Sequence, residues 1–349
     1  MNKERKNIGS KVRIKVRDWA SIWGVSWILL CAFVSLFAYV IAPDHSPNAD
    51  QQFPELSLQS PGFNAQFLVT HDSVSSSVGN LSQWLFGKPV KQNWIALSEV
   101  QMNQSQPYVI TAAYHDTIFQ PQGIIRNRTF WLGTDALGRD VLSRVIIGTR
   151  ISFTIGLVAV IISVITGVFI GAIAGYFRSY IDAMLSWLMN VFWSIPTLLL
   201  VLIFAIAMGK GTAVVFVAVG LTMWVDVARI VRGQMLSLRE KEFAEAGRAL
   251  GFTHLRILFV HLLPNTFPSV LVIAASNFAS AILVESGLSF LGFGVQPPVP
   301  AWGSMIESHK NYLITGMPWL TLLPGICIML MVLAFTFAGN GLKNRLKGK

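Results

Sequence analysis

Long uncharged apolar runs are the feature that most constrains how this chain folds. Residues 151–177 and 183–209 are each 27 residues long and contain no charged side chain, and residues 19–43 form a third such run. A helix that spans a membrane needs about 20 apolar residues. The chain is also 53% hydrophobic and only 13% charged. These properties predict a polytopic membrane protein and exclude a soluble domain.

Three further runs, of which the first is weaker, complete a set of six predicted transmembrane helices in an all-α fold. They cover about residues 212–231, 266–293 and 317–338. The first of these contains Asp226 and Arg229, which share a helix face three residues apart, so we expect them to pair near the membrane surface. Pro196 lies inside the 183–209 run and should kink that helix.

The segments between the spans differ in character. Residues 1–18 carry seven Lys or Arg and form a basic tail, and residues 341–349 form a second basic tail. Residues 44–130 are polar with short β-like runs, such as 108–114, and are interpreted as a small insertion of a few strands. Residues 131–147 are interpreted as an interfacial segment, and residues 148–340 as the core that carries five of the spans.

The distribution of basic residues predicts the orientation of the chain. Six spans put both termini on one side, and the segments of that side carry 18 of the 27 Lys and Arg residues. Positive charge is enriched in cytoplasmic loops. Both termini and the loop at 234–265 are therefore predicted to be cytoplasmic, and the 44–130 insertion extracytoplasmic.

The polar stretch at 242–265 has the properties of a docking element. Glu242 and Glu245 suit the first turn of a short helix, and small residues follow at Ala246 and Gly247. Gly251 is a natural helix stop. Phe243, either Ala246 or Gly247, and Leu250 recur at helical spacing, which predicts an amphipathic helix that another protein can approach closely.

This stretch resembles the EAA loop of permease subunits from ATP-binding-cassette importers. The family pattern is matched by Glu245-Ala246-Gly247, by Gly251 and by the ending His261-Leu-Leu-Pro264, with Gly247 replacing an alanine and His261 an isoleucine. The ending resembles the dipeptide and oligopeptide branch. The resemblance implies that this loop couples transport to a cytoplasmic ATPase, through Glu242, Glu245, Ala246, Gly247, Gly251, Arg256 and Pro264.

Two further stretches resemble signatures of the same branch. The first is 131–144, which contains Gly-Thr-Asp and Gly-Arg-Asp, and the second is 285–303, which is rich in Gly and Pro and ends near Trp302. The first stretch is interpreted as a structural motif at the outer mouth of the pathway, and the second as a rigid external turn with Trp302 at the membrane interface. The charged residues expected to form ion pairs or caps are Asp135, Arg139, Asp140 and Arg144.

Glu285 is the acidic residue placed deepest in a predicted span. An intramembrane carboxylate must be paired, protonated or in contact with water, and it is a functional hypothesis by default. Two roles stay open: Glu285 faces the substrate pathway, or it holds helices together by hydrogen bonds. Gly167, Gly171 and Gly175 recur every four residues and predict close helix packing.

Several chemistries have no sequence support. The chain contains no phosphate-binding loop, nucleophile elbow or zinc-protease motif. Cys31 and Cys327 lie in apolar segments and predict neither a disulfide nor a metal site. His254 and His261 lack the further ligands that a metal needs. The predictions are no catalytic residue, no metal, no cofactor on this chain and no nucleic-acid partner.

The resemblance implies the type I importer permease fold in a bacterial inner membrane. It implies a second, homologous permease, two ATPase subunits that carry ATP and Mg, an extracytoplasmic solute-binding protein and surrounding lipid. The expected function is to form half of the pathway for peptides. Alternatives are import of nickel or another small solute, a proton-coupled secondary transporter that uses Glu285, and a sensor module built on the insertion. The secondary transporter would require inverted repeats and broken helices, neither of which the sequence reveals.

Overall fold

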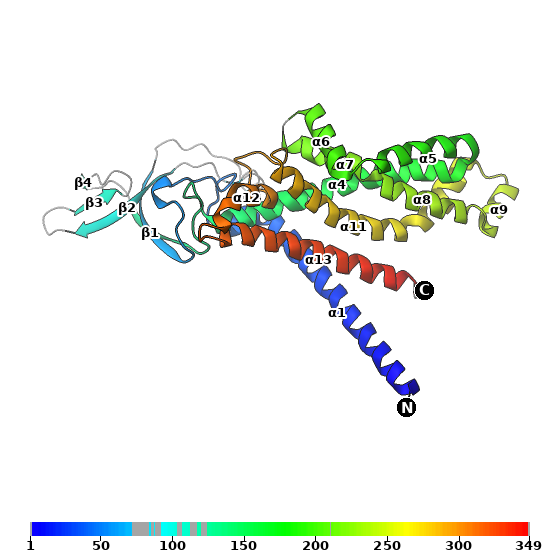
Figure 1. Ribbon diagram of the computed structural model, residues 1–349, viewed down its shortest axis with the longest axis horizontal. Coiled ribbons are helices and arrows are strands. Elements are labelled where there is room, and N and C mark those ends of the chain that lie inside the picture. Colours follow the sequence, from blue (N-terminus) through cyan, green and yellow to red (C-terminus); the bar gives the residue numbers. More distant parts are fainter. Residues whose placement is uncertain are drawn as a thin grey trace. The chain divides into compact units, whose positions relative to one another are not determined.

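The computed structural model describes residues 2–71, 84, 87, 92–102, 107–111, 117–119, 124–209 and 211–347. The chain divides into two units. The helical unit contains residues 1–32, 152–296 and 326–349, and the sheet unit contains residues 33–151 and 297–325. Figure 1 shows their elements.

Five helical segments are long and apolar enough to cross a membrane. They are Trp19–Leu36, Val141–Phe177, Thr212–Leu238, His254–Phe290 and Trp319–Leu346. A sixth candidate is a pair of helices, Ser179–Ser194 and Thr197–Met208, which are bent by 94° at the break between them. Counting this pair as one span gives the six that were predicted, so the polytopic all-α class with a small sheet is confirmed.

The structure changes several of the expected bounds. α1 (Asn2–Leu36) runs through the residues predicted to be a basic tail, and α13 (Trp319–Lys347) runs through most of the other tail. α2 (Ala38–Ile41) is a separate turn after α1. α4 (Val141–Phe177) begins inside the predicted interfacial segment, so residues 141–147 are its first turns and do not form a separate helix.

Breaks divide two of the predicted spans. α5 (Ser179–Ser194) ends before Pro196 and α6 (Thr197–Met208) begins after it, because proline has no N–H and clashes with the preceding turn. The kink expected at Pro196 is therefore a full break. α7 (Thr212–Thr222) and α8 (Trp224–Leu238) meet at Met223. α11 (Leu263–Phe290) follows a π-helical turn, η2 (Ile257–Leu262).

Glycines hold α4 directly against α8. A Cβ atom at Gly167 would lie 2.5 Å from the Val227 Cβ, and a Cβ atom at Gly175 would lie 2.5 Å from the Met235 Cβ. Gly171, between them, faces the backbone of Ala228. The three glycines thus form the small-residue face that the four-residue repeat predicted, and backbones approach closely there because no side chain intervenes.

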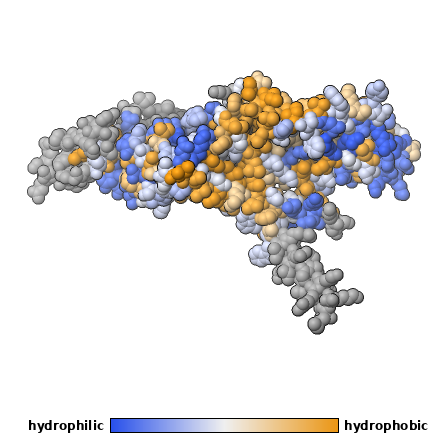
Figure 2. All heavy atoms as spheres, in the orientation of Figure 1, coloured by the Kyte–Doolittle hydropathy of each residue, from blue (hydrophilic) through white to orange (hydrophobic). Residues whose placement is uncertain are grey.

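Aromatic and small residues attach the terminal helices of the helical unit. Gly24 of α1 lies against Ala334 and Phe337 of α13, and the Phe278 ring of α11 stacks on Phe335 with 3.8 Å between ring centroids. Hydrophobic side chains cover much of this unit in Figure 2, whereas hydrophilic side chains gather at its α9 end (α9, Glu242–Ala249). The apolar surface is what a membrane-embedded unit requires.

The sheet unit confirms the small β content predicted for the insertion. Five antiparallel strands lie in the order β4-β3-β2-β1-β5. Phe53, Phe67 and Phe130 pack together as its core, and Phe67 and Phe130 are fully buried. The strands are β1 (Phe63–His71), β2 (Gln92–Met102), β3 (Pro107–Thr111), β4 (Thr117–Phe119) and β5 (Ile124–Phe130). Residues 112–114 of the predicted β run lie outside the described residues.

Short helices complete the sheet unit. They are η1 (Pro54–Leu56), α12 (Trp302–His309) and η3 (Lys310–Leu313). Trp302 is only 2% exposed, and its indole Nε1 donates a hydrogen bond to the Val145 carbonyl over 3.1 Å. Trp302 was predicted to lie at the membrane interface. The structure instead buries it against α4, where Gly148 leaves room for the indole ring.

Candidate functional site

The predicted docking helix is α9, which covers the first half of the stretch at 242–265. It begins after Lys241 and carries Glu242 and Glu245 in its first turn, where acidic groups stabilise the positive end of the helix dipole. Its end is a Schellman motif. The Phe252 N–H donates to the Gly247 carbonyl and the Gly251 N–H to the Arg248 carbonyl, both over 3.0 Å. Gly251 has φ +75°, a conformation that glycine adopts without strain.

Small residues attach α9 to the rest of the helical unit. Ala244 and Gly247 are buried, and Ala244 packs in a cluster with Ile257, Leu258 and Met235. The apolar side chains point outward: Phe243 is 44% exposed and Leu250 is 73% exposed. The helix is therefore amphipathic as expected, but the face on which Phe243 and Leu250 lie is open to a partner.

The other predicted coupling residues surround this helix. Glu242, Glu245 and Ala246 are exposed. Arg256 is exposed and lies over the Phe252 ring, 4.1 Å from its centroid. Pro264 lies where the π-helical turn η2 passes into α11.

The loop that leaves the long helices is shorter than the 234–265 predicted. α8 continues to Leu238, and helical structure resumes with α10 (His254–Arg256), η2 and α11. The Thr253 hydroxyl caps α10 by accepting from the Arg256 N–H over 3.4 Å. His254 and His261 do not meet: the His254 Nδ1 lies 2.8 Å from the Tyr176 hydroxyl, whereas His261 stacks on Phe252.

The four charged residues of the predicted outer motif come together in the sheet unit, and all are buried. Asp135 Oδ1 accepts from the N–H groups of Leu137 and Arg139, and its Oδ2 accepts from the Arg139 Nε over 2.8 Å. The Arg144 Nε lies 3.8 Å from the same oxygen. Asp140 accepts hydrogen bonds from the hydroxyl and the N–H of Ser143, at the start of α4.

Three residues that the sequence analysis did not single out complete this ion cluster. Arg139 also pairs with Asp50 over 3.1 Å, the Arg128 guanidinium lies 3.7 Å from Asp140, and the His309 Nε2 lies 3.9 Å from Asp135. Burial lowers the pKa of His309, against the opposing effect of Asp135. Burial also raises the pKa of Asp140, although its hydrogen bonds to Ser143 oppose that shift.

Glu285 lies buried among packed helices. It is 1% exposed, and its Oε1 accepts a hydrogen bond from the Ser289 hydroxyl over 2.7 Å. Its other oxygen is buried and has no hydrogen-bond partner among the described residues. Ser289 lies one turn along the same helix α11, so this hydrogen bond does not join two helices, and the pathway role and the helix-holding role both stay open.

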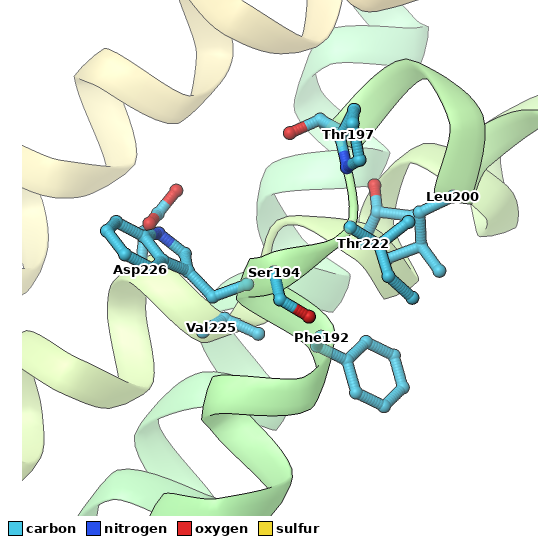
Figure 3. A pocket seen from close by; sticks show the side chains of 10 residues that line it. Phe192, Ser194, Thr197, Leu200, Thr222, Val225 and Asp226 are labelled. Atoms are coloured by element: carbon cyan, nitrogen blue, oxygen red, sulfur yellow. The ribbon is translucent and has the colours of Figure 1, made fainter.

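An open cavity occurs where the broken helices meet. It measures about 340 Å³ and is lined by residues of α5, α6, α7 and α8 together with the bend at 195–196. Figure 3 shows Ser194 and Thr197 on either side of the bend, Thr222 at the end of α7 and Asp226 on α8. Asp226 does not form the predicted ion pair with Arg229, whose guanidinium donates to Asn190 over 2.7 Å.

The sequence offers one signal for this cavity. Asp226, which is predicted to lie near the membrane surface, falls near the middle of the apolar helical segment Thr212–Leu238. A charged residue there, together with Pro196 in the middle of the neighbouring run, indicates two interrupted helices. The broken helix is also a feature that the sequence analysis did not find. Among the described residues, no group of three or more His, Cys, Asp or Glu is arranged to hold a metal.

Residues 167–348 match the family described as binding-protein-dependent transport system inner membrane component. The dipeptide transport system permease protein DppC of Alkalihalophilus pseudofirmus is 37% identical over 219 residues, 63% of this chain and 72% of that protein. The oligopeptide permease protein OppC of Salmonella typhimurium is 42% identical and the glutathione permease protein GsiD of Pectobacterium atrosepticum 36% identical, with the same coverage.

Among solved structures, an inward-facing form of the MetNI methionine ABC transporter is similar with a TM-score of 0.47 and 19% sequence identity. The similarity covers 59% of this chain and 95% of that chain. The family match extends over more than half of the sequence, and the relatives are covered over 72% of their own length. The chain therefore belongs to the family of binding-protein-dependent transport system inner membrane components.

Proposed function

We propose that this chain is one transmembrane subunit of an ATP-driven importer of peptides in a bacterial inner membrane. The relatives in the comparison transport dipeptides, oligopeptides and glutathione according to their names, and all of these are peptides. Nickel or another small solute is the alternative cargo for the same architecture. A proton-coupled carrier built on Glu285 is disfavoured, because Glu285 is enclosed among packed helices.

The observation that carries the coupling role is the exposed face of α9. Phe243 and Leu250 present large apolar side chains to solvent, whereas the small residues Ala244 and Gly247 attach the helix to its own unit. Exposed apolar groups beside acidic ones are typical of a protein–protein contact. In this proposal a cytoplasmic ATPase subunit covers that face, binds ATP and Mg itself, and moves α9 as it closes.

The proposed assembly contains this chain, a second homologous permease, two ATPase subunits and an external binding protein. Both termini and the loop with α9 lie in the cytoplasm. Closure of the ATPase dimer displaces α9 and, through α8, the helices that line the pathway, as in other rigid-body switches. ATP hydrolysis takes place on the partner subunits.

The test is co-purification of the tagged chain from its native membrane with variants of α9. Gly251→Pro cannot adopt φ +75° and destroys the end of the helix, and Glu245→Lys reverses an exposed charge in its first turn. Both variants should remain in the membrane at normal levels, lose the ATPase subunits and lose peptide uptake at least tenfold. Gly233→Ala is the control, because Gly233 lies in helix α8 and a Cβ there meets no atom within 4 Å.

A second pair of variants separates docking from folding. Leu250→Ser removes an exposed apolar side chain from α9, and Ile314→Ser removes one from the sheet unit, where Ile314 is 90% exposed. Only Leu250→Ser should weaken ATPase binding. Stoichiometric ATPase and normal uptake in Gly251→Pro, Glu245→Lys and Leu250→Ser would refute the docking role of α9.

A further inference from the structure

Two helix breaks meet at the cavity beside Asp226, and both lie near the middle of apolar spans. One break lies between α5 and α6 at residues 195–196, and the other lies at Met223 between α7 and α8. The Met223 carbonyl accepts a hydrogen bond from the Asn277 side chain over 3.2 Å. Non-helical backbone at membrane depth is tolerated where it lies against protein or a water-filled cavity.

Two of the three hydroxyl groups that line this cavity donate their protons to backbone carbonyls. The Ser194 hydroxyl donates its proton to the Val191 carbonyl over 2.8 Å, and the Thr222 hydroxyl donates to the Val219 carbonyl over 2.8 Å. Since each hydroxyl has only one proton, the remaining lone pairs can only accept. A ligand can therefore bond to Ser194 and Thr222 only as a donor, whereas the Thr197 hydroxyl, which also lines the cavity, keeps a proton to donate.

Asp226 gives the cavity its charge. Among the residues that the structure describes, Asp226 has no hydrogen bond and no ion pair, and Arg229 acts on it only at longer range. Arg229 is held elsewhere, by Asn190 and by the ring of Trp193, whose centroid is 4.1 Å away. The C-terminus of α5, which carries the negative end of its helix dipole, and the N-terminus of α6, which carries the positive end, both border the cavity. These two partial charges oppose each other, so the full negative charge of Asp226 decides the sign of the electrostatic potential in the cavity.

We propose that this cavity is a binding site within the permease for an ammonium group of the transported solute. Asp226 supplies the counter-charge from one wall of the cavity. The Ser194 and Thr222 hydroxyls lie on the other side of the cavity in Figure 3, where they can accept hydrogen bonds from other N–H groups of the same solute. A cavity of about 340 Å³ holds the end of a small molecule. The identity of this ammonium as the amino terminus of a peptide rests on the proposed function.

The first experiment measures the electrostatic potential of the cavity without reference to the cargo. In the assembled complex, with Cys31 and Cys327 replaced by alanine, Ser194→Cys is labelled with an ammonium-bearing and a sulfonate-bearing methanethiosulfonate reagent. The ammonium reagent should react at least tenfold faster, and adding Asp226→Asn should remove that preference. Asp226→Glu, which keeps the charge, should retain it. Leu199→Cys is the control, because Leu199 is 53% exposed but does not line the cavity.

The second experiment identifies the ligand group. Trialanine with a free amino terminus should protect Ser194→Cys from labelling, whereas N-acetyl-trialanine at the same concentration should not. Asp226→Asn should abolish the protection. Equal protection by both peptides, or an unchanged reagent preference in Asp226→Asn, would overturn the proposal.

Two other outcomes have separate meanings. If Asp226→Asn releases the second permease from the complex, Asp226 pairs with a cation of that subunit and the ammonium site is refuted. If the unmodified complex takes up no peptide but Ser194→Cys keeps its Asp226-dependent preference for the ammonium reagent, the peptide cargo is wrong and the cation site stands.

Discussion

The contact between α4 and α8 leads to a prediction whose size can be worked out from the structure. Gly171→Ala adds a Cβ atom that would overlap the Ala228 carbonyl oxygen and lie 2.9 Å from the Ala228 Cα. Carbon atoms pack best at about 3.5–4.0 Å, so the two helices must separate by roughly 0.5–1 Å. Overpacking of this kind costs about 1–3 kcal/mol.

The matched control is Gly233→Ala on α8, where a Cβ meets nothing within 4 Å. Both substitutions replace a helical glycine and gain up to about 1 kcal/mol of helix propensity, so the difference between the variants isolates the steric cost. Thermal unfolding of the purified chain in detergent is the assay. The midpoint of Gly171→Ala should lie several degrees below that of Gly233→Ala. Equal midpoints would show that α4 and α8 do not approach as closely as the structure indicates.

Three further predictions use the same assay. Asp182→Asn should lower the free energy of unfolding by about 1–2 kcal/mol, because Asp182 accepts two hydrogen bonds from Arg232, at 2.5 and 2.8 Å. The control is Glu240→Gln. Glu240 forms an exposed ion pair with Arg178, so this variant should change the free energy of unfolding by less than about 0.5 kcal/mol. Equal losses would contradict this. Gly138→Ala should destabilise the sheet unit by more than about 3 kcal/mol, because Gly138 has φ +70° and an added Cβ atom would overlap the Phe53 carbonyl. Gly62→Ala is the control and should cost less, because Gly62 also has a positive φ but an added Cβ atom there would meet no atom within 4 Å. Burial lowers the pKa of His309 in the folded chain, whereas the imidazole of the unfolded chain titrates near its ordinary pKa of 6.5. As the pH falls, the unfolded chain therefore binds this proton before the folded chain does, and the free energy of unfolding should drop between pH 7.5 and 5.5. His309→Gln should flatten that drop, and an unchanged slope would rule His309 out as its source.

The sequence predicted those parts of the fold that depend on local patterns. The number of spans followed from uncharged runs, and the packing face of α4 followed from the spacing of Gly167, Gly171 and Gly175. The start and end of α9 followed from its acids and Gly251. Each of these features is determined by neighbours within a few residues in sequence, which is why periodicity and capping rules detect them.

The remainder depended on residues far apart in sequence. The buried face of α9 is decided by Ile257 and Met235, and the ion cluster at Asp135 is completed by Asp50 and His309, which no spacing rule connects to it. The cavity beside Asp226 was not predicted for a similar reason. It depends on a break at Pro196 in another helix, far from Asp226 in sequence.

Helix α8 contacts the cavity, α4 and α5 along its length. Its first residues border the cavity with Asp226, its middle packs on the glycines of α4, and its Arg232 is held by Asp182 of α5. Its last residue, Leu238, leads within a few residues to α9. Because the α4 contact has no intervening side chains, α8 cannot bend away from α4 without opening that interface. In the proposed switch, a displacement of α9 that passes through α8 moves α4 with it and shifts the wall that carries Asp226 relative to the bend at Pro196.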